Sequence, residues 1–176
     1  MVEHKYIQVI VQQMIKQNLN DHRRKFLISC LRNLLFDVET YEEQFLDLGV
    51  PKDICKVLID EQGLKSELPE GWPEEFSAKA DKDASAIDFA NTSQLIECLF
   101  LLHKSPVLLQ KLRDLKAHEI LLKVNMPKTK EYVDVTHRID ELVIQLAMPG
   151  ATEADSSGLQ QMAAAAPDAP EGAAQE

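Results

Sequence analysis

The amino-acid sequence predicts an all-α protein built as a short solenoid, in which helices stack side by side. Two observations lead to this fold class. Apolar residues recur at helical spacing in nearly every periodic stretch of the chain. In addition, the pattern of residues 26–35 returns at 94–103, as in repeat proteins whose units bury their apolar faces against one another.

Length and composition fit one soluble globular domain in the cytoplasm. A chain of 176 residues can bury a sizeable core, and 45% hydrophobic and 27% charged residues are ordinary values. The sequence has no apolar run long enough for a membrane span and no cleavage site typical of a signal peptide. The three cysteines, each inside an apolar stretch, are typical of reduced core residues in a cytosolic or nuclear protein.

The charge is negative overall and unevenly spread. A net charge of −10 argues against general nucleic-acid binding. Residues 1–38 hold six Lys/Arg and three Asp/Glu, whereas residues 60–90 hold nine acids and three lysines. Such asymmetry marks either the faces that meet different partners or simply a solvated surface.

The N-terminal part of the chain is predicted to form four helices. The first covers 6–15, and Asn20-Asp21 caps the second. The third, over 39–48, stops at Gly49, and Pro51 opens the fourth in its first turn, where a missing N–H costs nothing. The stripes expected to be buried are Tyr6, Ile7, Ile10, Val11, Met14 and Ile15; Phe26, Leu27, Cys30, Leu31, Leu34 and Leu35; Tyr41, Phe45 and Leu48; and Ile54, Val57 and Leu58.

Residues 61–90 are predicted to be an acidic loop inserted into the helical domain. They show no sustained period and contain two glycines and two prolines that break regular structure. The tail, residues 150–176, consists mainly of Ala, Pro, Gly and acids and is predicted to be disordered. The helical domain is therefore expected to cover residues 1–149.

Helices resume after the loop. Thr92 or Ser93 is expected to cap the first of them, and Ser105-Pro106 opens a second that runs through Leu115. A short helix follows through Val124 and is ended by Pro127. The last helix runs from about Lys130 to Ala147, with a stripe of Val135, Ile139, Leu142, Val143 and Leu146.

The repetition extends over three helices in each copy. Residues 26–35 align with 94–103, and with one residue fewer in the turn Ile54 aligns with Leu121. The apolar pairs are Leu27 with Leu95, Ile28 with Ile96, Cys30 with Cys98, Leu31 with Leu99, Leu34 with Leu102, Phe45 with Leu112, and Leu48 with Leu115. Two similar copies can also arise by chance in a Leu-rich helical protein.

The first copy resembles an armadillo repeat. A helix ends in Asn33-Leu34, a second ends at Gly49, and Val50-Pro51 opens a third. Gly49 is expected to adopt the left-handed conformation that a sharp turn between short helices requires. The resemblance implies a right-handed α-solenoid of about two and a half repeats. It also implies that Asn33 faces a concave groove for a protein partner, with Lys25, Ser29, Arg32 and Phe36 near it.

A narrower resemblance covers residues 21–148. The basic cluster "HRRK", the motif "LRNLLF", Leu68-Pro69 in an acidic surround and the helix of 92–103 are similar to the C-terminal half of the HGH-type armadillo family. The resemblance implies a cytosolic adaptor that recognises nascent translation elongation factor two and delivers it to the TRiC chaperonin and the ninety-kilodalton heat-shock chaperone. The alternative is a generic armadillo-type scaffold for signalling or complex assembly, without a chaperone role.

The sequence predicts no catalytic, cofactor or metal site, so a non-enzymatic protein is expected. It contains no glycine-rich phosphate loop, HExxH or GxSxG motif, and its five histidines are scattered. Cys98, the one conceivable nucleophile, has apolar neighbours that favour an inert core thiol. An enzyme whose site leaves no sequence signature is the remaining alternative.

Two further features are candidate partner contacts with structural alternatives. The basic cluster 22–25 lies at the positive end of a helix dipole and needs compensation, from the acidic 60–90 segment or from an acidic partner. Trp72, between Gly71 and Pro73, is suited to be an exposed anchor for a partner. Alternatively, Trp72 packs into the solenoid and holds the insertion down.

Overall fold

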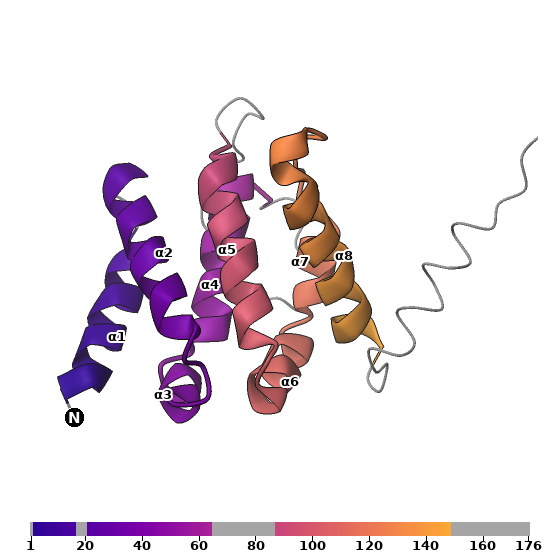
Figure 1. The fold of residues 1–176 in the computed structure, drawn as a ribbon. Helices are drawn as coiled ribbons and strands as arrows, with labels where there is room; N and C mark the ends of the chain where they lie inside the picture. Colours follow the sequence, from indigo (N-terminus) through magenta and orange to yellow (C-terminus); the bar gives the residue numbers. More distant parts are fainter. Residues whose placement is uncertain (1, 17–20, 65–86, 149–176) are drawn as a thin grey trace, which may run out of the picture.

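The chain is all-α, as predicted. The computed structural model describes residues 2–16, 21–64 and 87–148, and all regular secondary structure in these ranges is helical (Figure 1). No helix in them is long and apolar enough to cross a membrane. The α-helices are α1 (Val2–Met14), α2 (Asp21–Leu35), α3 (Glu42–Asp47), α4 (Val50–Gln62), α5 (Phe89–Leu102), α6 (Pro106–Asp114), α7 (Ala117–Leu121) and α8 (Val133–Ala147), with a 3₁₀-helix, η4, at Lys130–Tyr132.

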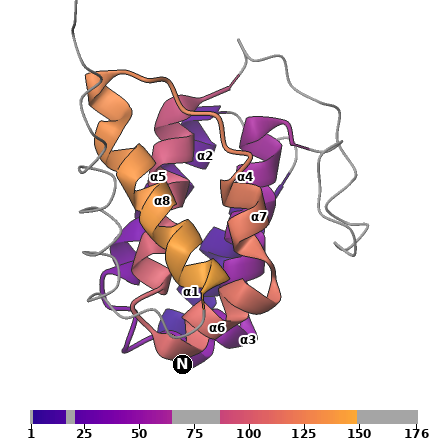
Figure 2. The same cartoon turned by 90° about the vertical axis from the view of Figure 1, so that its right-hand side faces the viewer.

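The helices form two rows. In the front row α2, α5 and α8 lie side by side, and α5 contacts both of its neighbours (Figure 1). In the back row α1, α4 and α7 follow one another, with α1 behind α2, α4 behind α5 and α7 behind α8 (Figure 2). The short helices α3 and α6 lie below the rows in Figure 1, next to the C-terminal ends of α2 and α5. The two sequence copies, α2–α3–α4 and α5–α6–α7, therefore occupy corresponding places.

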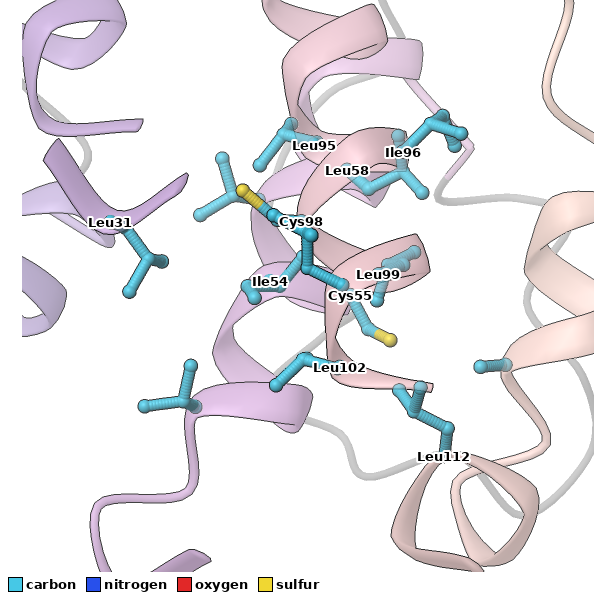
Figure 3. Packing of buried hydrophobic residues seen from close by; sticks show 14 of the residues in the cluster. Leu31, Ile54, Cys55, Leu58, Leu95, Ile96, Cys98, Leu99, Leu102 and Leu112 are labelled. Atoms are coloured by element: carbon cyan, nitrogen blue, oxygen red, sulfur yellow. The ribbon is translucent and has the colours of Figure 1, made fainter. Parts of the chain in front are cut away.

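The core lies between the two rows and runs through both sequence copies. Leu31 of α2 and its aligned counterpart Leu99 of α5 belong to one buried cluster, together with Ile54 and Leu58 of α4 (Figure 3). Fully burying such an aliphatic side chain contributes about 1.5–3 kcal/mol relative to leaving it exposed. The pairing of Leu31 with Leu99 thus reflects a shared burial pattern.

One predicted helix boundary is confirmed and two need correction. Ser105 caps α6, because its Oγ accepts a hydrogen bond from Leu108 N at 3.1 Å. Helix α5 begins at Phe89 rather than after Thr92, since the Asp88 side chain accepts from Asn91 N at 3.0 Å and acts as the cap. Helix α4 runs to Gln62, two residues into the predicted loop, and ends at Gly63, which is left-handed at φ 66°.

The predictions that Tyr6 and Phe26 are buried were wrong. Their side chains are 65% and 66% exposed, whereas Ile7, Val11 and Leu31 of the same helices are buried as expected. Helices α1 and α2 stand at one end of the rows, so their outer sides have no neighbouring helix among the described residues. The apolar stripe is wider than the surface these helices bury.

Three other boundaries are shifted. Helix α1 starts at Val2, α3 is confined to Glu42–Asp47, and α7 ends at Leu121. Such shifts at helix termini follow from fraying and from turns that continue the chain without helical hydrogen bonds. Leu68-Pro69 and the tail 150–176 lie outside the described residues.

Both sequence copies use the same sharp turn between their second and third helices. Gly49, before α4, adopts the predicted left-handed conformation at φ 69°. Lys116 stands at the corresponding place before α7 and adopts φ 51°, the only positive φ of a non-glycine residue in the described ranges. A left-handed backbone costs a residue with a Cβ atom about 1–2 kcal/mol. The second copy therefore keeps the turn at an energetic cost.

We expect opposite effects from exchanging the residue types at these two turns. Lys116→Gly should raise the free energy of unfolding by about 0.5–1 kcal/mol, because relief of backbone strain exceeds the added entropy of the unfolded chain. Gly49→Ala should lower it by about 1 kcal/mol, since an added Cβ meets no atom within 4 Å and only the backbone strain counts. Urea titrations of both variants measure these changes. A loss of stability in Lys116→Gly would contradict the explanation.

Candidate partner-binding face

The predicted groove residues lie on the solvent side of the front row. Lys25 and Asn33 are exposed on α2, and Phe36, directly after α2, is 59% exposed. Neighbouring side chains of α5 and α8 complete what we call the three-helix face, defined by Lys25, Ser29, Arg32, Asn33, Phe36, Gln94, Glu97, Phe100 and Arg138. Trp72, the sixth predicted contact residue, lies outside the described residues.

A carboxylate between two guanidinium groups joins the three helices. Glu97 of α5 has its Oε2 atom 2.7 Å from Arg32 Nε of α2, and Arg32 Nη2 donates to Glu97 Oε1 at 3.1 Å. Arg138 Nη1 of α8 approaches the same Oε1 atom to 3.4 Å. The side chains of Arg32 and Arg138 remain 33% and 40% exposed. A guanidinium carries five N–H donors, so each arginine keeps donors for a partner.

Each arginine also lies over an aromatic ring. The Arg32 Cζ atom is 5.4 Å from the centre of the Phe36 ring, and the Arg138 Cζ atom is 5.5 Å from the centre of the Phe100 ring. A cation–π contact at an exposed site contributes about 0.5–1 kcal/mol. Together with Glu97, the rings hold both guanidinium groups in place before any partner arrives. Arginine and aromatic residues are the types that dominate binding energy at protein interfaces.

Ser29 and Asn33 play different parts on this face. Ser29 Oγ lies 2.9 Å from both Lys25 O and Gln94 Oε1, so its single hydroxyl proton serves bonds within the protein, including one from α2 to α5. The Asn33 amide has no hydrogen-bond partner among the described residues and is exposed. Asn33 is thus available to a partner, whereas Ser29 joins two helices.

Sequence reasoning missed Gln94 and also the three residues around the two arginine–aromatic contacts, Glu97, Phe100 and Arg138. The alignment of 26–35 with 94–103 places Ser29 over Glu97 and Arg32 over Phe100. Transferring the candidate residues to the second copy would therefore have found two of the three. Arg138 lies on α8, outside both copies, and its place depends on how α8 packs against α5. No pattern in the sequence predicts the register in which α8 packs against α5.

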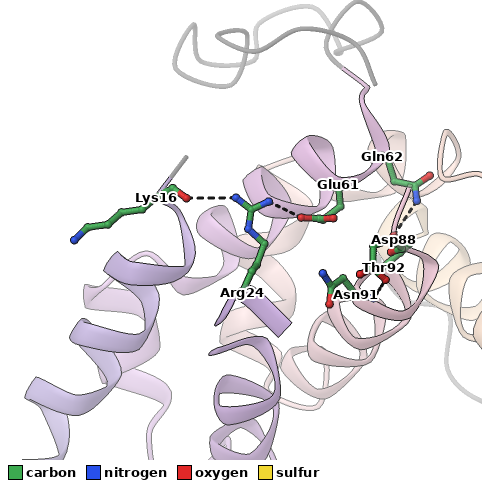
Figure 4. Close-up of polar contacts among 7 residues, drawn as sticks. All are labelled: Lys16, Arg24, Glu61, Gln62, Asp88, Asn91 and Thr92. Carbon is green, nitrogen blue, oxygen red and sulfur yellow. Dashed lines mark hydrogen bonds and ion pairs between the residues drawn. The ribbon is translucent and has the colours of Figure 1, made fainter. Parts of the chain in front are cut away.

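The basic cluster 22–25 is partly compensated inside the protein. Arg24 is buried, and its Nη1 atom donates to Glu61 Oε1 at 2.6 Å, near the end of α4 (Figure 4). Arg24 Nη2 also donates to Lys16 O at 3.3 Å, after the end of α1. Of the two explanations offered for the cluster, an internal acid therefore accounts for Arg24. Lys25 is exposed and belongs to the three-helix face.

The same region holds a buried polar link between α4 and α5. Gln62 Nε2 donates to Thr92 Oγ1 at 2.9 Å (Figure 4), and Gln62 Oε1 accepts from Asn125 N at 3.0 Å. The Gln62 amide thus joins α4, α5 and the segment after α7. The neighbouring Arg24–Glu61 pair joins α2 to α4, so these contacts fix how three of the central helices are placed.

Two of the three thiols lie in the buried core. Burial raises the pKa of the Cys98 thiol to about 12, and it raises that of Cys55 to about 12 as well. Thiols with such pKa values form almost no thiolate near neutral pH, and the thiolate is the nucleophile. In the ranges that the structure describes, no group of three or more His, Cys, Asp or Glu side chains could hold a metal ion.

No family model, curated protein or solved structure matches this chain. The armadillo-type resemblance therefore stays a prediction from the sequence motifs.

Proposed function

We propose that the chain is a non-enzymatic protein-binding adaptor that holds its partner on the three-helix face. In this proposal the two rows of helices are a short armadillo-like, right-handed solenoid of about two and a half repeats. The side-by-side order of α2, α5 and α8, with α1, α4 and α7 behind them, supports it. So does the left-handed turn shared by Gly49 and Lys116.

The observation that carries the proposal is the fixed pair of arginines. Arg32 and Arg138 come from the two outer helices of the front row and share one carboxylate, Glu97. Holding long side chains in place before binding reduces the entropy lost when a partner docks. Their remaining donors suit the carbonyl and carboxylate oxygens of a polypeptide partner, and the rings of Phe36 and Phe100 suit its apolar groups.

The family resemblance narrows the partner. It implies that the bound client is nascent translation elongation factor two, and that the TRiC chaperonin and the ninety-kilodalton heat-shock chaperone receive it in the cytosol. Lys25 and Asn33, which the armadillo resemblance assigns to a partner groove, are exposed, and Arg32 keeps donors free beside Glu97, so these side chains are accessible to such a client. A scaffold without a chaperone role would use the same face for other proteins.

We expect the double variant Arg32→Glu/Arg138→Glu to lose partner capture without unfolding. Reversing both charges places three carboxylates together on the face, and affinity for elongation factor two should fall at least about tenfold, equivalent to about 1.4 kcal/mol. The purified factor and the tagged chain can be titrated by calorimetry, with circular dichroism to check helicity. The pairs are partly exposed, so their loss costs only about 1 kcal/mol of stability or less.

A matched control separates the face from the overall charge. Lys111→Glu/Lys130→Glu makes the same change in net charge at exposed positions on α6 and η4, away from the face. Equal loss of affinity in both double variants would contradict the proposed face. If the wild-type chain captured neither elongation factor two nor the two chaperones, the chaperone role would be wrong, while capture of other proteins through Arg32 and Arg138 would favour the generic scaffold.

A further inference from the structure

Exposed large apolar side chains gather at the two ends of the rows. Of the eight that the described residues contain, three lie on α1–α2 and three on or beside α7–α8, while Phe36 belongs to the three-helix face and Val107 to α6. The six at the ends are Tyr6 (65% exposed), Val9 (54%) and Phe26 (66%) at one end, and Leu122 (67%), Val133 (45%) and Met148 (56%) at the other. The ends of the rows, unlike their middle, thus leave apolar surface uncovered.

The α1–α2 end has the pattern of a side that meets a preceding helix. In the repeat alignment Phe26 corresponds to Gln94, and Cys30 corresponds to Cys98. Both α5 residues face α2: Gln94 accepts a hydrogen bond from Ser29, and Cys98 is fully buried on the α2 side of α5 (Figure 3). Helix α2 is the first of the front row, with no described helix before it in that row, and there Phe26 is exposed and Cys30 only half-buried.

The α7–α8 end has the pattern of a side that meets a following helix. The alignment of Ile54 with Leu121 pairs Cys55 with Leu122 and Ile59 with Met126. Cys55 and Ile59 are fully buried, because α5, α6 and α7 pack against α4. At the corresponding positions after α7, Leu122 is 67% exposed and Met126 is only half-buried.

These uncovered positions open into a pocket. Between α7, the segment that follows it and α8 lies a pocket of about 280 Å³. Leu122 and Met126 line it together with Ile139 and Val143 of α8. The pocket is large enough for an aromatic side chain. Six of its ten lining residues are apolar and suit such a ring, and the other four are Asn125, Lys128, Thr136 and Asp140.

We propose that the α7–α8 end binds the α1–α2 end of a second copy of this chain, with Phe26 of one copy entering the pocket of the other. Within one chain, α4–α5 already receives α7–α8 by the same kind of contact. The uncovered α7–α8 end corresponds to the side of α4–α5 that contacts the following pair of helices. The uncovered α1–α2 end corresponds to the side of α4–α5 that contacts the preceding pair, so the two ends are the two halves of one kind of contact. One association thereby covers both sets of exposed apolar residues.

The charge distribution agrees with this arrangement. Copies with a net charge of −10 repel one another, but residues 1–38 hold six Lys/Arg and three acids, while residues 117–148 hold four Lys/Arg and five acids. Joining these two ends therefore avoids the most acidic parts of the chain. Because the two surfaces differ, the contact is heterologous and continues from copy to copy unless a ring closes.

The test is association of the 176-residue chain and of two variants, each with one damaged end. The molar mass is measured by light scattering after gel filtration, at about 0.15 M salt to screen the repulsion between copies. The mass of the wild-type protein should rise above 19.9 kDa as its concentration increases. Phe26→Glu and Leu122→Glu should each remain at 19.9 kDa alone, because each retains only one usable end. Mixed at equal concentration they should form a dimer, since the intact end of one fits the intact end of the other.

Controls make each outcome decisive. Phe26, Leu122 and Val107 are exposed, so at a low protein concentration, where the copies are separate, their glutamate variants should unfold at the wild-type temperature. Val107 lies on α6, away from both ends, so Val107→Glu should associate like the wild type. A wild-type mass that stays at 19.9 kDa at every concentration would overturn the proposal. So would association that survives Leu122→Glu but not Phe26→Glu, which indicates a symmetric contact, or a variant mixture that stays monomeric.

Discussion

Replacing Glu61 by alanine should lower the free energy of unfolding by about 3–5 kcal/mol, the range for breaking one partner out of a buried ion pair. The side chains of Arg24 and Glu61 are only 9% and 4% exposed. Without Glu61, the guanidinium of Arg24 stays buried with its charge unpaired, and its Nε atom already has no hydrogen-bond partner in the described structure. Urea titration followed by circular dichroism measures the loss.

Two comparison variants test the cause of this loss. Glu97→Ala removes a glutamate carboxylate from a partly exposed ion pair. We expect this change to lower the free energy of unfolding by about 1 kcal/mol or less. The double variant Arg24→Met/Glu61→Leu should recover most of the stability, because it removes both buried charges and fills the space with apolar groups. Equal losses in Glu61→Ala and Glu97→Ala would contradict the buried ion pair between α2 and α4.

Replacing Leu99 by alanine should cost about 2–5 kcal/mol, through lost burial and the cavity left behind. Leu99 is 1% exposed and belongs to the same buried cluster as Ile54 and Cys55 of α4, the helix behind α5 (Figure 3). Leu122→Ala is the matched control: its side chain is 67% exposed, so the change should stay within about 0.5 kcal/mol. Both are measured by urea titration at low protein concentration. Similar values for the two leucines would show that the core does not run between the rows.

The sequence predicts helix boundaries best where a residue type suits only one kind of local structure. Gly49 suits a left-handed turn, and Ser105 before Pro106 suits the start of a helix, and both are found there. The start of α5 was missed because Asp88 lies at the edge of a segment whose apolar residues show no helical spacing. Without such spacing beside it, an aspartate is not recognisable as a helix cap. Lys116 shows the reverse case, in which the turn is kept although its residue type does not favour it.

Burial at the ends of the rows could not be predicted from helical spacing. Phe26 continues the apolar stripe of α2, yet it is exposed, because spacing reports the side of a helix and not whether a neighbour covers it. Its counterpart Gln94 has the opposite character: it is polar and contacts α2. Only the order of helices in space separates these two positions.

Part of the candidate face was accessible from the sequence and part was not. Arg32, Asn33 and Phe36 were found because the repeat motif marks their helix. Glu97 and Arg138 meet Arg32 only because α5 and α8 lie beside α2 in one register. Likewise, the sequence left two explanations for the basic cluster 22–25, an internal acid or an acidic partner. For Arg24 the structure supports the internal acid, because its side chain is buried against Glu61.

The three-helix face can be tested most directly by photo-crosslinking in cells. A benzoylphenylalanine replaces Phe36, which is 59% exposed beside Arg32, or Val107, which is 48% exposed on α6 away from the face. We predict covalent adducts with another protein from position 36, lost in the Arg32→Glu/Arg138→Glu background, and none of these adducts from position 107. The same adducts from both positions, or none from position 36, would contradict the proposal that this face binds a protein partner.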